Sequence, residues 1–384
     1  MLQFAIPCLL GLESLVGDEV KKLGLSDIQI EHGRILCRGT QEDLARLNVN
    51  LRCGARVILV LNQFRADNFE ALFQGVKAIP WEEWIPRDGE FPVKGYSINS
   101  TLHSVPACQA IVKKAIVERL SAIYGLTTLP ETGKRTQIRF SIMKDDVMIG
   151  LDTSGEGLYK RGYRAVGVAA PLKETLAAAM VQLSRYRGKD PFCDPFCGSG
   201  TIAIEAALIA QNRAPGLNRT FAAQNWPVLH KTIWLNAAQE ALDKEFHGKN
   251  YEIWGGDIDP KAIEIAQHNA ALAEVDDIVR FEVSDAATFH WGGQYGRIVT
   301  NPPYGERLLE RTEAEALYRS FGKAVEKLPD TWRVSILSSH TEFERCFGRK
   351  ADRKRRYHKR SLYNPERASV ERPLPWTFLS AFQS

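Results

Sequence analysis

The chain contains no apolar run that approaches the roughly 20 residues a helix needs to cross a bilayer. Its first segment, residues 1–15, is mildly apolar. However, it carries no leading positive charge and no small-residue cleavage site, and Glu13 interrupts it. We therefore expect a strand followed by the start of a helix at this place, and neither a signal peptide nor a membrane partner.

Paired cysteines are also missing. The cysteines are odd in number, scattered along the chain, and form no Cys-x-x-Cys pair. They are Cys8, Cys37, Cys53, Cys108, Cys193, Cys197 and Cys346. No histidine cluster stands near the closest two, so the spacing of a structural zinc site is lacking. We expect a chain that works in the reducing cytoplasm, without a disulfide framework and without a metal.

Low-complexity linkers and internal repeats are absent as well, and nothing in the composition is typical of a disordered or fibrous chain. What remains is the composition of a globular protein, with 44% hydrophobic and 25% charged residues. At 384 residues the chain is too long for one ordinary core, so we expect two or three domains.

Residues 1–164 have the mixed pattern of an α+β region. Apolar residues recur on one face of a helix that should begin near Pro106. Further on, residues 137–142 alternate polar and apolar side chains, a Lys-Asp-Asp turn follows, and residues 147–151 run back. This pattern predicts a β-hairpin.

From residue 165 to residue 384, short apolar strands alternate with helices. The expected strands are Pro191–Asp194, Glu252–Gly256, Ile278–Val283, Arg297–Thr300 and Trp332–Leu337. The expected helices are Leu172–Tyr186, Thr201–Ala210, Pro260–Ala273 and Ala314–Lys327. Such alternation predicts an α/β fold with a mostly parallel sheet between helices. Ligands of these folds bind at the carboxyl ends of the strands.

The first of these strands runs into a glycine-rich turn, Asp-Pro-Phe-Cys-Gly-Ser-Gly-Thr at residues 194–201. Its glycines allow close approach of the backbone to a ligand and a sharp turn into the helix. The spacing also fits a dinucleotide fingerprint, which raises a nicotinamide-dependent oxidoreductase as an alternative. However, a pyrophosphate would lie beside the Asp194 carboxylate, and the two negative groups would repel each other. S-adenosylmethionine has no phosphate and carries two cationic groups, so the acid favours it.

Acids also follow the next two strands. Asp257 can accept hydrogen bonds from both ribose hydroxyls of such a cofactor, with Ile258 against the adenine, and Asp285 can accept from the adenine amino group. Each of these acids could instead only cap a helix, and capping is the preferred interpretation for Asp259 before Pro260. The succession of acids after consecutive strands favours a cofactor site.

The fourth strand ends in Asn301-Pro302-Pro303-Tyr304. A plain turn is the alternative interpretation. An exocyclic base amine is a poor nucleophile because its lone pair is delocalised into the ring. The Asn301 side-chain oxygen and the Pro302 carbonyl can accept from the amine hydrogens, and the two prolines would hold these acceptors rigidly. Tyr304 can stack on the base, which must be unpaired or flipped out of a duplex.

These stretches resemble class I methyltransferases that act on amines of nucleic-acid bases. Residues 158–164, Leu-Tyr-Lys-Arg-Gly-Tyr-Arg, and residues 170–178 are similar to the junction between a THUMP domain and its methyltransferase. Residues 213–219 fit the same group. Within it, the chain resembles the bacterial ribosomal large-subunit guanine-N2 methyltransferases, including members often labelled N6-adenine DNA methylases.

The resemblance implies a ferredoxin-like piece and a THUMP RNA-binding domain over residues 1–164. It implies a Rossmann-like class I methyltransferase with a mostly parallel seven-stranded sheet over residues 165–384. The implied catalytic residues are Asn301, Pro302, Pro303 and Tyr304. The implied S-adenosylmethionine-binding residues are Thr175, Asp194, Phe196, Cys197, Gly198, Ser199, Gly200, Thr201, Asp257, Ile258, Asp285 and Asn301.

The implied activity is methyl transfer to the N2 amine of a guanine in RNA, with 23S ribosomal RNA as the first choice. A guanine of tRNA, the N6 amine of adenine, and a non-catalytic RNA-binding assembly factor remain alternatives, because other aromatic amines make the same mechanistic demand and THUMP domains also serve tRNA enzymes.

The charge distribution also favours RNA as the partner. The net charge is only +4, but residues 345–360 are strongly basic and are opposed only by Asp352. In the enzymes that this chain resembles, this stretch falls at a late strand near the target base, which favours phosphate contacts over a solvated basic face. The basic helix face formed by Lys113, Lys114 and Arg119 stays ambiguous, because such charges often serve solubility alone.

Overall fold

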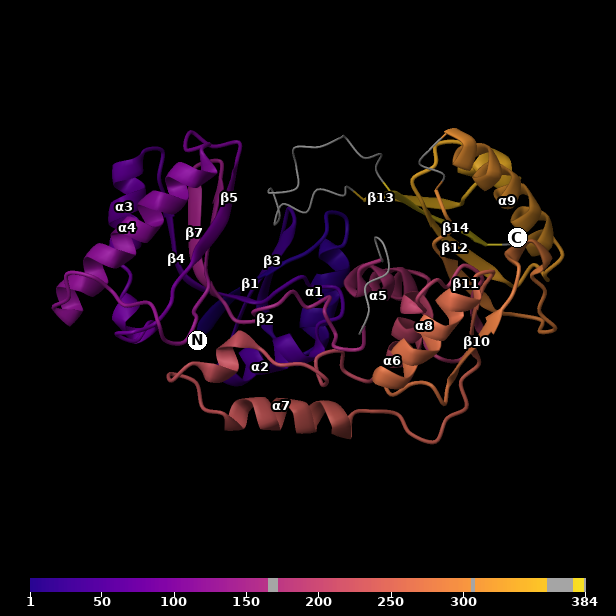
Figure 1. Ribbon diagram of the computed structural model, residues 1–384, viewed down its shortest axis with the longest axis horizontal. Helices are drawn as coiled ribbons and strands as arrows, with labels where there is room; N and C mark the ends of the chain where they lie inside the picture. The colour runs from indigo at the N-terminus through magenta and orange to yellow at the C-terminus, as the bar shows by residue number, and fades with distance from the viewer. Residues whose placement is uncertain (165–171, 305–307, 358–375, 383–384) are drawn as a thin grey trace.

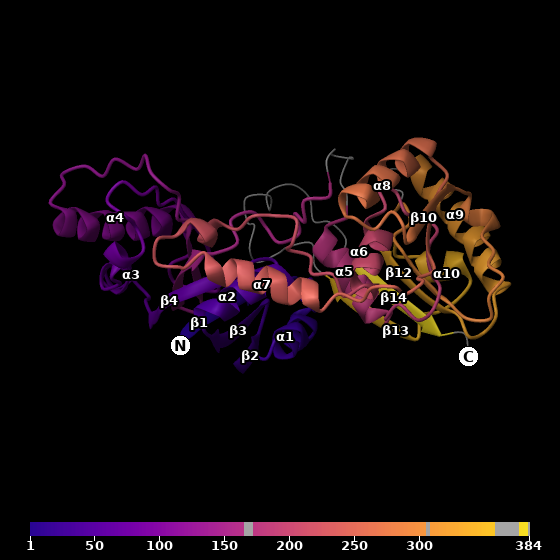
Figure 2. The same cartoon turned by 90° about the horizontal axis from the view of Figure 1, so that it is seen from below.

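The computed structural model describes residues 1–164, 172–304, 308–357 and 376–382 (Figure 1). The predicted positions 170–171 and 358–360 lie outside these ranges. Two seven-stranded sheets, each with helices packed on it, occupy the two halves of an elongated molecule (Figures 1 and 2).

The N-terminal half contains one mostly antiparallel sheet with the order β2-β3-β1-β4-β7-β6-β5. Its strands are β1 (Leu2–Pro7), β2 (Ser26–Glu31), β3 (Arg34–Gly39), β4 (Ile58–Arg65), β5 (Val93–Ile98), β6 (Ile138–Met143) and β7 (Asp146–Asp152). The predicted hairpin is confirmed as β6 and β7, which pair antiparallel. β4 pairs with β1 on one side and with β7 on the other, so the early and late strands of this half share one sheet.

Four helices pack on this sheet: α1 (Glu13–Lys22), α2 (Gln41–Asn50), α3 (Phe69–Lys77) and α4 (Val105–Tyr124). The predicted helix near Pro106 is confirmed as α4, which ends at Gly125 in the left-handed conformation. On the exposed face of α4, Lys113 pairs with Glu131 and Arg119 pairs with Glu82, each at 2.6 Å. These two cations are therefore engaged in ion pairs within this half, which weakens the case for an RNA-binding face on α4.

The C-terminal half has the predicted α/β architecture. Its sheet has the order β10-β9-β8-β11-β12-β14-β13, in which β14 is antiparallel to both of its neighbours and the other pairings are parallel. The strands are β8 (Phe192–Asp194), β9 (Ile253–Asp257), β10 (Val279–Val283), β11 (Arg297–Thr300), β12 (Arg333–Ser338), β13 (Arg353–Tyr357) and β14 (Trp376–Phe382). The mostly parallel seven-stranded sheet is confirmed.

The helices of this half are α5 (Glu174–Leu183), α6 (Thr201–Ala210), α7 (Thr232–Asp243), α8 (Pro260–Leu272), α9 (Leu308–Glu326) and α10 (Phe343–Phe347). The four predicted helices are present, but α5 is shorter than predicted and α9 begins earlier. The periodicity did not reveal α7, which lies in the insertion before β9. This helix packs on α2 of the other half (Figure 2), where Glu240 pairs with Arg46 at 3.0 Å.

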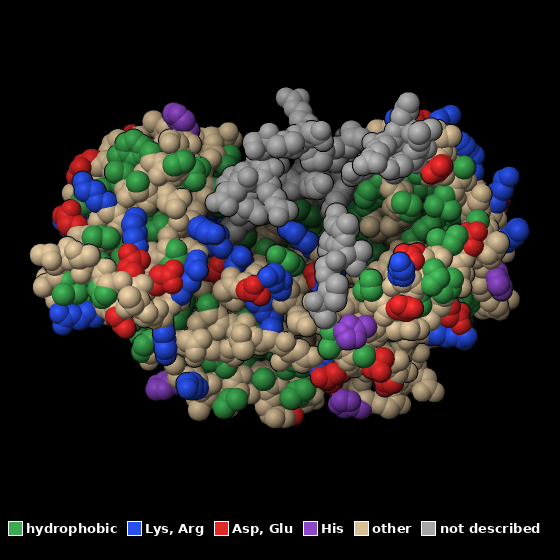
Figure 3. Space-filling model, in the orientation of Figure 1, with side chains coloured by type: hydrophobic (Ala, Val, Ile, Leu, Met, Phe, Trp, Pro, Cys, Tyr) green, Lys and Arg blue, Asp and Glu red, His purple; other side chains and the backbone are tan. Residues whose placement is uncertain are grey.

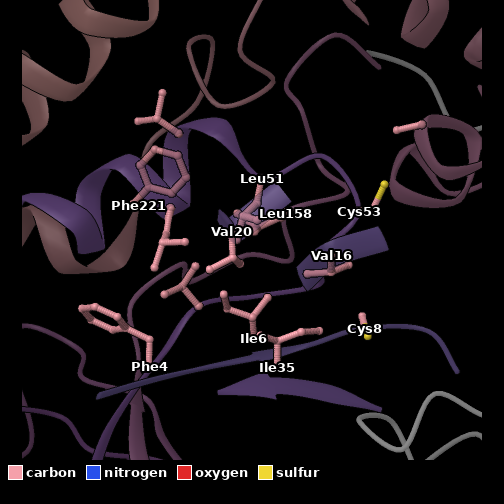
Figure 4. Close-up of a cluster of buried hydrophobic side chains, with 14 of the residues drawn as sticks. Phe4, Ile6, Cys8, Val16, Val20, Ile35, Leu51, Cys53, Leu158 and Phe221 are labelled. Carbon is pink, nitrogen blue, oxygen red and sulfur yellow. The ribbon is translucent and has the colours of Figure 1, made fainter. Parts of the chain in front are cut away.

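The two halves share a buried core as well as this helix contact. Figure 4 shows Leu158, from the segment before the C-terminal half, and Phe221, from the insertion in that half, in one cluster with residues of β1 and α1 such as Phe4 and Val20. Because residues from both sides of the proposed boundary at residue 164 are buried together, the junction is a packed interface rather than an open linker.

Candidate active site

A cavity of about 470 Å³ lies at the carboxyl ends of β8 to β11, where a ligand of this fold is expected. Most of the predicted residues line it: Phe196, Cys197, Gly198, Ser199, Thr201, Asp257, Ile258, Asp285, Asn301 and Pro303. Six lining residues were not predicted: Leu172, Pro195, Ile202, Ser284, Ala286 and Leu317. A larger groove of about 810 Å³ runs along β10 and contains none of the predicted site residues.

The two glycines of the turn after β8 have different structural roles. Gly198 has a φ of 51°, and a Cβ atom placed on it would meet nothing within 4 Å, so the backbone is open to a ligand on this side. Gly200 has a φ of 81°, and a Cβ atom there would lie 2.8 Å from the Phe281 ring. Gly200 is therefore required for packing of α6 against the sheet, and it does not line the cavity.

Backbone amides hold the Asp257 carboxylate in place. Gly198 donates an N–H to one oxygen at 2.9 Å and Asp259 donates to the other at 3.1 Å, which ties the ends of β8 and β9 together. Ile258 lines the cavity beside this carboxylate and is 69% exposed. The carboxylate and the exposed apolar side chain can contact the polar and flat parts of one ligand.

The capping interpretation holds for Asp259, whose carboxylate accepts the Lys261 N–H at 3.0 Å at the start of α8. Asp285 both caps a turn and lines the cavity. One of its oxygens accepts the Ala287 N–H at 2.8 Å and caps a single 3₁₀ turn, Ala286–Thr288, while the residue lines the cavity. The cap orients the carboxylate, whose second oxygen can serve a ligand.

Asp194 is fully buried beneath the cavity rather than in its wall. One carboxylate oxygen accepts the Thr300 hydroxyl at 2.6 Å and the Phe196 N–H at 3.3 Å. Its second oxygen is buried without a hydrogen-bond partner among the described residues. Burial, which outweighs the hydrogen bonds, raises the pKa of Asp194 to about 7.

This pKa predicts a pH dependence of stability. An unfolded aspartate has a pKa of about 3.9, so the folded state keeps a proton that the unfolded chain releases. The stability gained is complete below about pH 4 and is lost as the pH rises through about 7. Relative to Asp194→Asn, which cannot ionise, the wild-type free energy of unfolding should fall by about 1.4 kcal/mol per pH unit between about pH 5 and 7. Urea denaturation at several pH values measures this, and a pH-independent difference would contradict it.

The Asn-Pro-Pro-Tyr loop follows β11 at the cavity. Asn301 and Pro303 line the cavity, whereas Pro302 is buried and Tyr304 is half-buried outside the lining. The Tyr304 hydroxyl donates to the Asn301 side-chain oxygen. The two side chains are thus paired with each other, and a base amine that used the Asn301 oxygen would share this oxygen with the hydroxyl or displace the hydroxyl.

Comparison with known protein families shows which family the chain belongs to. Residues 161–364 match the model of the RMKL-like methyltransferase domain, residues 3–58 that of the RlmL ferredoxin-like domain, and residues 66–152 that of the THUMP domain. The chain belongs to the RMKL-like methyltransferase family. The family match agrees with the predicted methyltransferase fold, and the nicotinamide alternative is not supported.

Several relatives match this methyltransferase over nearly its whole length. The protein of Bacillus subtilis (strain 168) named "Putative RNA methyltransferase YpsC" is 44% identical over 349 residues, which are 90% of each chain. A structure described as "a predicted N6-adenine-specific DNA methylase" of Listeria monocytogenes is 43% identical with a TM-score of 0.90, covering 99% of this chain and 96% of that one. The structure of "SMU.472, a putative methyltransferase complexed with SAH" is 38% identical with a TM-score of 0.88, covering 99% and 98%.

A residue that supports the cavity wall was also not predicted. Arg164 donates to the Thr201 hydroxyl at 2.8 Å and to the Leu172 carbonyl at 3.1 Å, and both partners line the cavity. Its place in the Arg-Gly-Tyr-Arg stretch before the methyltransferase was the signal that could have identified it. Thr175, which was predicted to bind the cofactor, lies on the first turn of α5 outside the cavity lining.

The basic stretch is partly neutralised in the described residues. Arg345 pairs with Glu342 at 2.8 Å, and Lys354 pairs with Glu344. Residues 353–357 form β13, the edge strand of the methyltransferase sheet. On the face shown in Figure 3, Lys and Arg side chains are interspersed with Asp and Glu side chains over both halves.

Three further observations concern the described residues. No group of three or more His, Cys, Asp or Glu side chains among them is placed to hold a metal ion. None of their helices is both long and apolar enough to cross a membrane. All seven cysteines are buried and unpaired.

Proposed function

We propose that this methyltransferase transfers a methyl group from S-adenosylmethionine to the exocyclic N2 amine of a guanine in RNA, and that the RNA is 23S ribosomal RNA. The observation that carries the proposal is the shared cavity: Asn301 and Pro303 line it together with Asp257 and Asp285. Acceptors suited to a base amine are thereby next to acids suited to the cofactor.

The residues present fit S-adenosylmethionine. The open backbone at Gly198 leaves room for a ligand, and the second oxygen of Asp194 is buried without a hydrogen-bond partner among the described residues. A cationic group of the ligand above Asp194 would favour the ionised form of this carboxyl. Asp257 would hold the ribose hydroxyls, with Ile258 against the adenine and Asp285 at its amino group. When bound, the cofactor supplies a methyl group on a positively charged sulfur. A solved relative described as complexed with SAH supports this choice.

The chain's own residues would activate and orient the target amine. The Asn301 oxygen and the Pro302 carbonyl accept its hydrogens, which raises the electron density on the nitrogen and stabilises the positive charge that develops there. Tyr304 leaves Asn301 and stacks on the base when the base enters. Catalysis of this kind rests on positioning, so it needs no covalent intermediate.

The N-terminal half supports RNA over DNA. The matched THUMP domain and a relative named as an RNA methyltransferase both favour an RNA substrate. We infer that residues 1–164 hold the RNA and residues 165–384 catalyse transfer, with help from exposed basic residues of β13. We also infer that the protein works in the cytoplasm, where its unpaired cysteines would stay reduced.

The test is transfer of labelled methyl groups to total RNA and to DNA, followed by digestion to nucleosides. We expect N2-methylguanosine from 23S ribosomal RNA. Label in tRNA alone would overturn the ribosomal assignment. Label in N6-methyladenine of DNA would overturn both the base and the RNA assignment. RNA binding without transfer would leave a non-catalytic assembly factor.

A further inference from the structure

The proposed catalytic loop has few backbone hydrogen-bond donors of its own. Pro302 and Pro303 have no backbone N–H, so half of the four-residue loop cannot donate to the neighbouring strands. Rigid prolines limit the shape of the loop but do not fix its position over the cavity. A donor on another element that bonds to a carbonyl of the loop can therefore help to hold the loop in position.

Tyr318 of α9 is such a donor, since its hydroxyl donates to the Pro303 carbonyl. The neighbouring residue Leu317 lines the cavity, so the same turn of α9 contacts both the cavity and the loop. A residue at this place can set the distance between the loop and the cavity wall.

The surroundings of Tyr318 hold its side chain firmly. The residue is fully buried, with its ring centroid 4.6 Å from that of Phe343 and 5.4 Å from that of His340. Burial raises the pKa of its phenol to about 12, although a hydrogen bond with Ser338 acts in the opposite direction. The hydroxyl is therefore protonated, and able to donate, throughout the physiological pH range.

We propose that Tyr318 is a positioning residue: by holding the Pro303 carbonyl it keeps Asn301 at the place where the target amine is bound. The inference rests on the proposed function, because positioning matters for catalysis only if the loop binds that amine. Tyr318 itself would not touch the base or the cofactor. Its effect should therefore be seen in the rate of transfer and not in binding of the cofactor.

The test is Tyr318→Phe, which removes the hydroxyl and keeps the ring. A matched control is Tyr186→Phe, since Tyr186 is also fully buried and its hydroxyl has no partner among the described residues. With Tyr318→Phe we expect kcat to fall about 10- to 100-fold, as expected when a reacting group is displaced by about 1 Å. The Kd of S-adenosylhomocysteine should change by less than about twofold, and the control should keep the wild-type kcat.

Two kinetic results would overturn the inference. One is an unchanged kcat in Tyr318→Phe. The other is a fall in kcat accompanied by comparable losses of cofactor affinity and thermal stability, which would indicate a purely structural role. Amide hydrogen exchange of the peptide 297–304 gives a readout without substrate. Faster exchange in Tyr318→Phe than in Tyr186→Phe supports the inference even if wild-type protein transfers no methyl group to RNA, a result that would count against the proposed function alone. Equal exchange in both variants overturns it.

Discussion

Replacing Asn301 by alanine should reduce methyl transfer by about 100- to 1,000-fold, the loss typical of removing one preorganised polar contact to a developing charge. Asn301 lines the cavity at the end of β11, and its side-chain oxygen is already held by the Tyr304 hydroxyl. The variant loses the acceptor that would orient the target amine, and the backbone acceptor at Pro302 remains. Initial rates at saturating cofactor measure the effect.

Cofactor binding separates this role from the alternative that Asn301 contacts mainly the cofactor. We expect the Kd of S-adenosylhomocysteine, measured by calorimetry, to change by no more than a few-fold. The matched control is Asn236→Ala, because Asn236 lies on the exposed side of α7 and its loss should leave the rate unaltered. A large loss of affinity with little change in kcat would contradict a catalytic role for Asn301.

The substitution Glu205→Ala should lower the free energy of unfolding by about 3–5 kcal/mol, which is the cost of removing one partner of a buried ion pair. Glu205 is fully buried on α6, 3.4 Å from the guanidinium of Arg161, which is itself only 3% exposed. Tyr163 donates its hydroxyl to the same carboxylate at 3.1 Å. Without Glu205, the Arg161 charge would be left in the interior, and its remaining partners among the described residues would be backbone carbonyls.

The location of this pair explains why its loss should affect both halves. Arg161 also donates to the carbonyls of Leu158 and of Arg52, so the pair joins α6 to the N-terminal half. Urea denaturation measures the effect. The control is Glu156→Ala, which removes an exposed partner of Lys160 and should cost less than about 1 kcal/mol.

A double variant provides a second test of the prediction for the Arg161–Glu205 pair. Replacing both partners with apolar residues of similar size, Arg161→Met with Glu205→Leu, should restore much of the stability lost in the single variant, because no unpaired charge is then buried. If Glu205→Ala costs no more than Glu156→Ala, the buried pair does not stabilise the junction and the prediction is wrong.

Much of the methyltransferase half could be predicted because the sequence patterns that identify its strands and loops are local. Short apolar runs bounded by turn residues identified the positions of the strands, and the glycine turn and the Asn301–Tyr304 loop followed directly from their ends. The same locality explains the misses. The helix α7 buries its apolar side chains against α2, which lies far away in the sequence, so the local pattern alone did not identify it.

The sequence by itself therefore determined the fold class, the family and most of the residues that line the cavity, since the order of strands in such a fold brings successive strand ends to one edge. Only the tertiary structure decided which residues hold that site. Tyr318 lies 15 residues beyond Pro303 and Arg164 lies 37 residues before Thr201, and no periodicity links such positions. It also decided that Asp194 is buried and has a raised pKa, because the loss of hydration depends on what every neighbouring element excludes from its carboxylate.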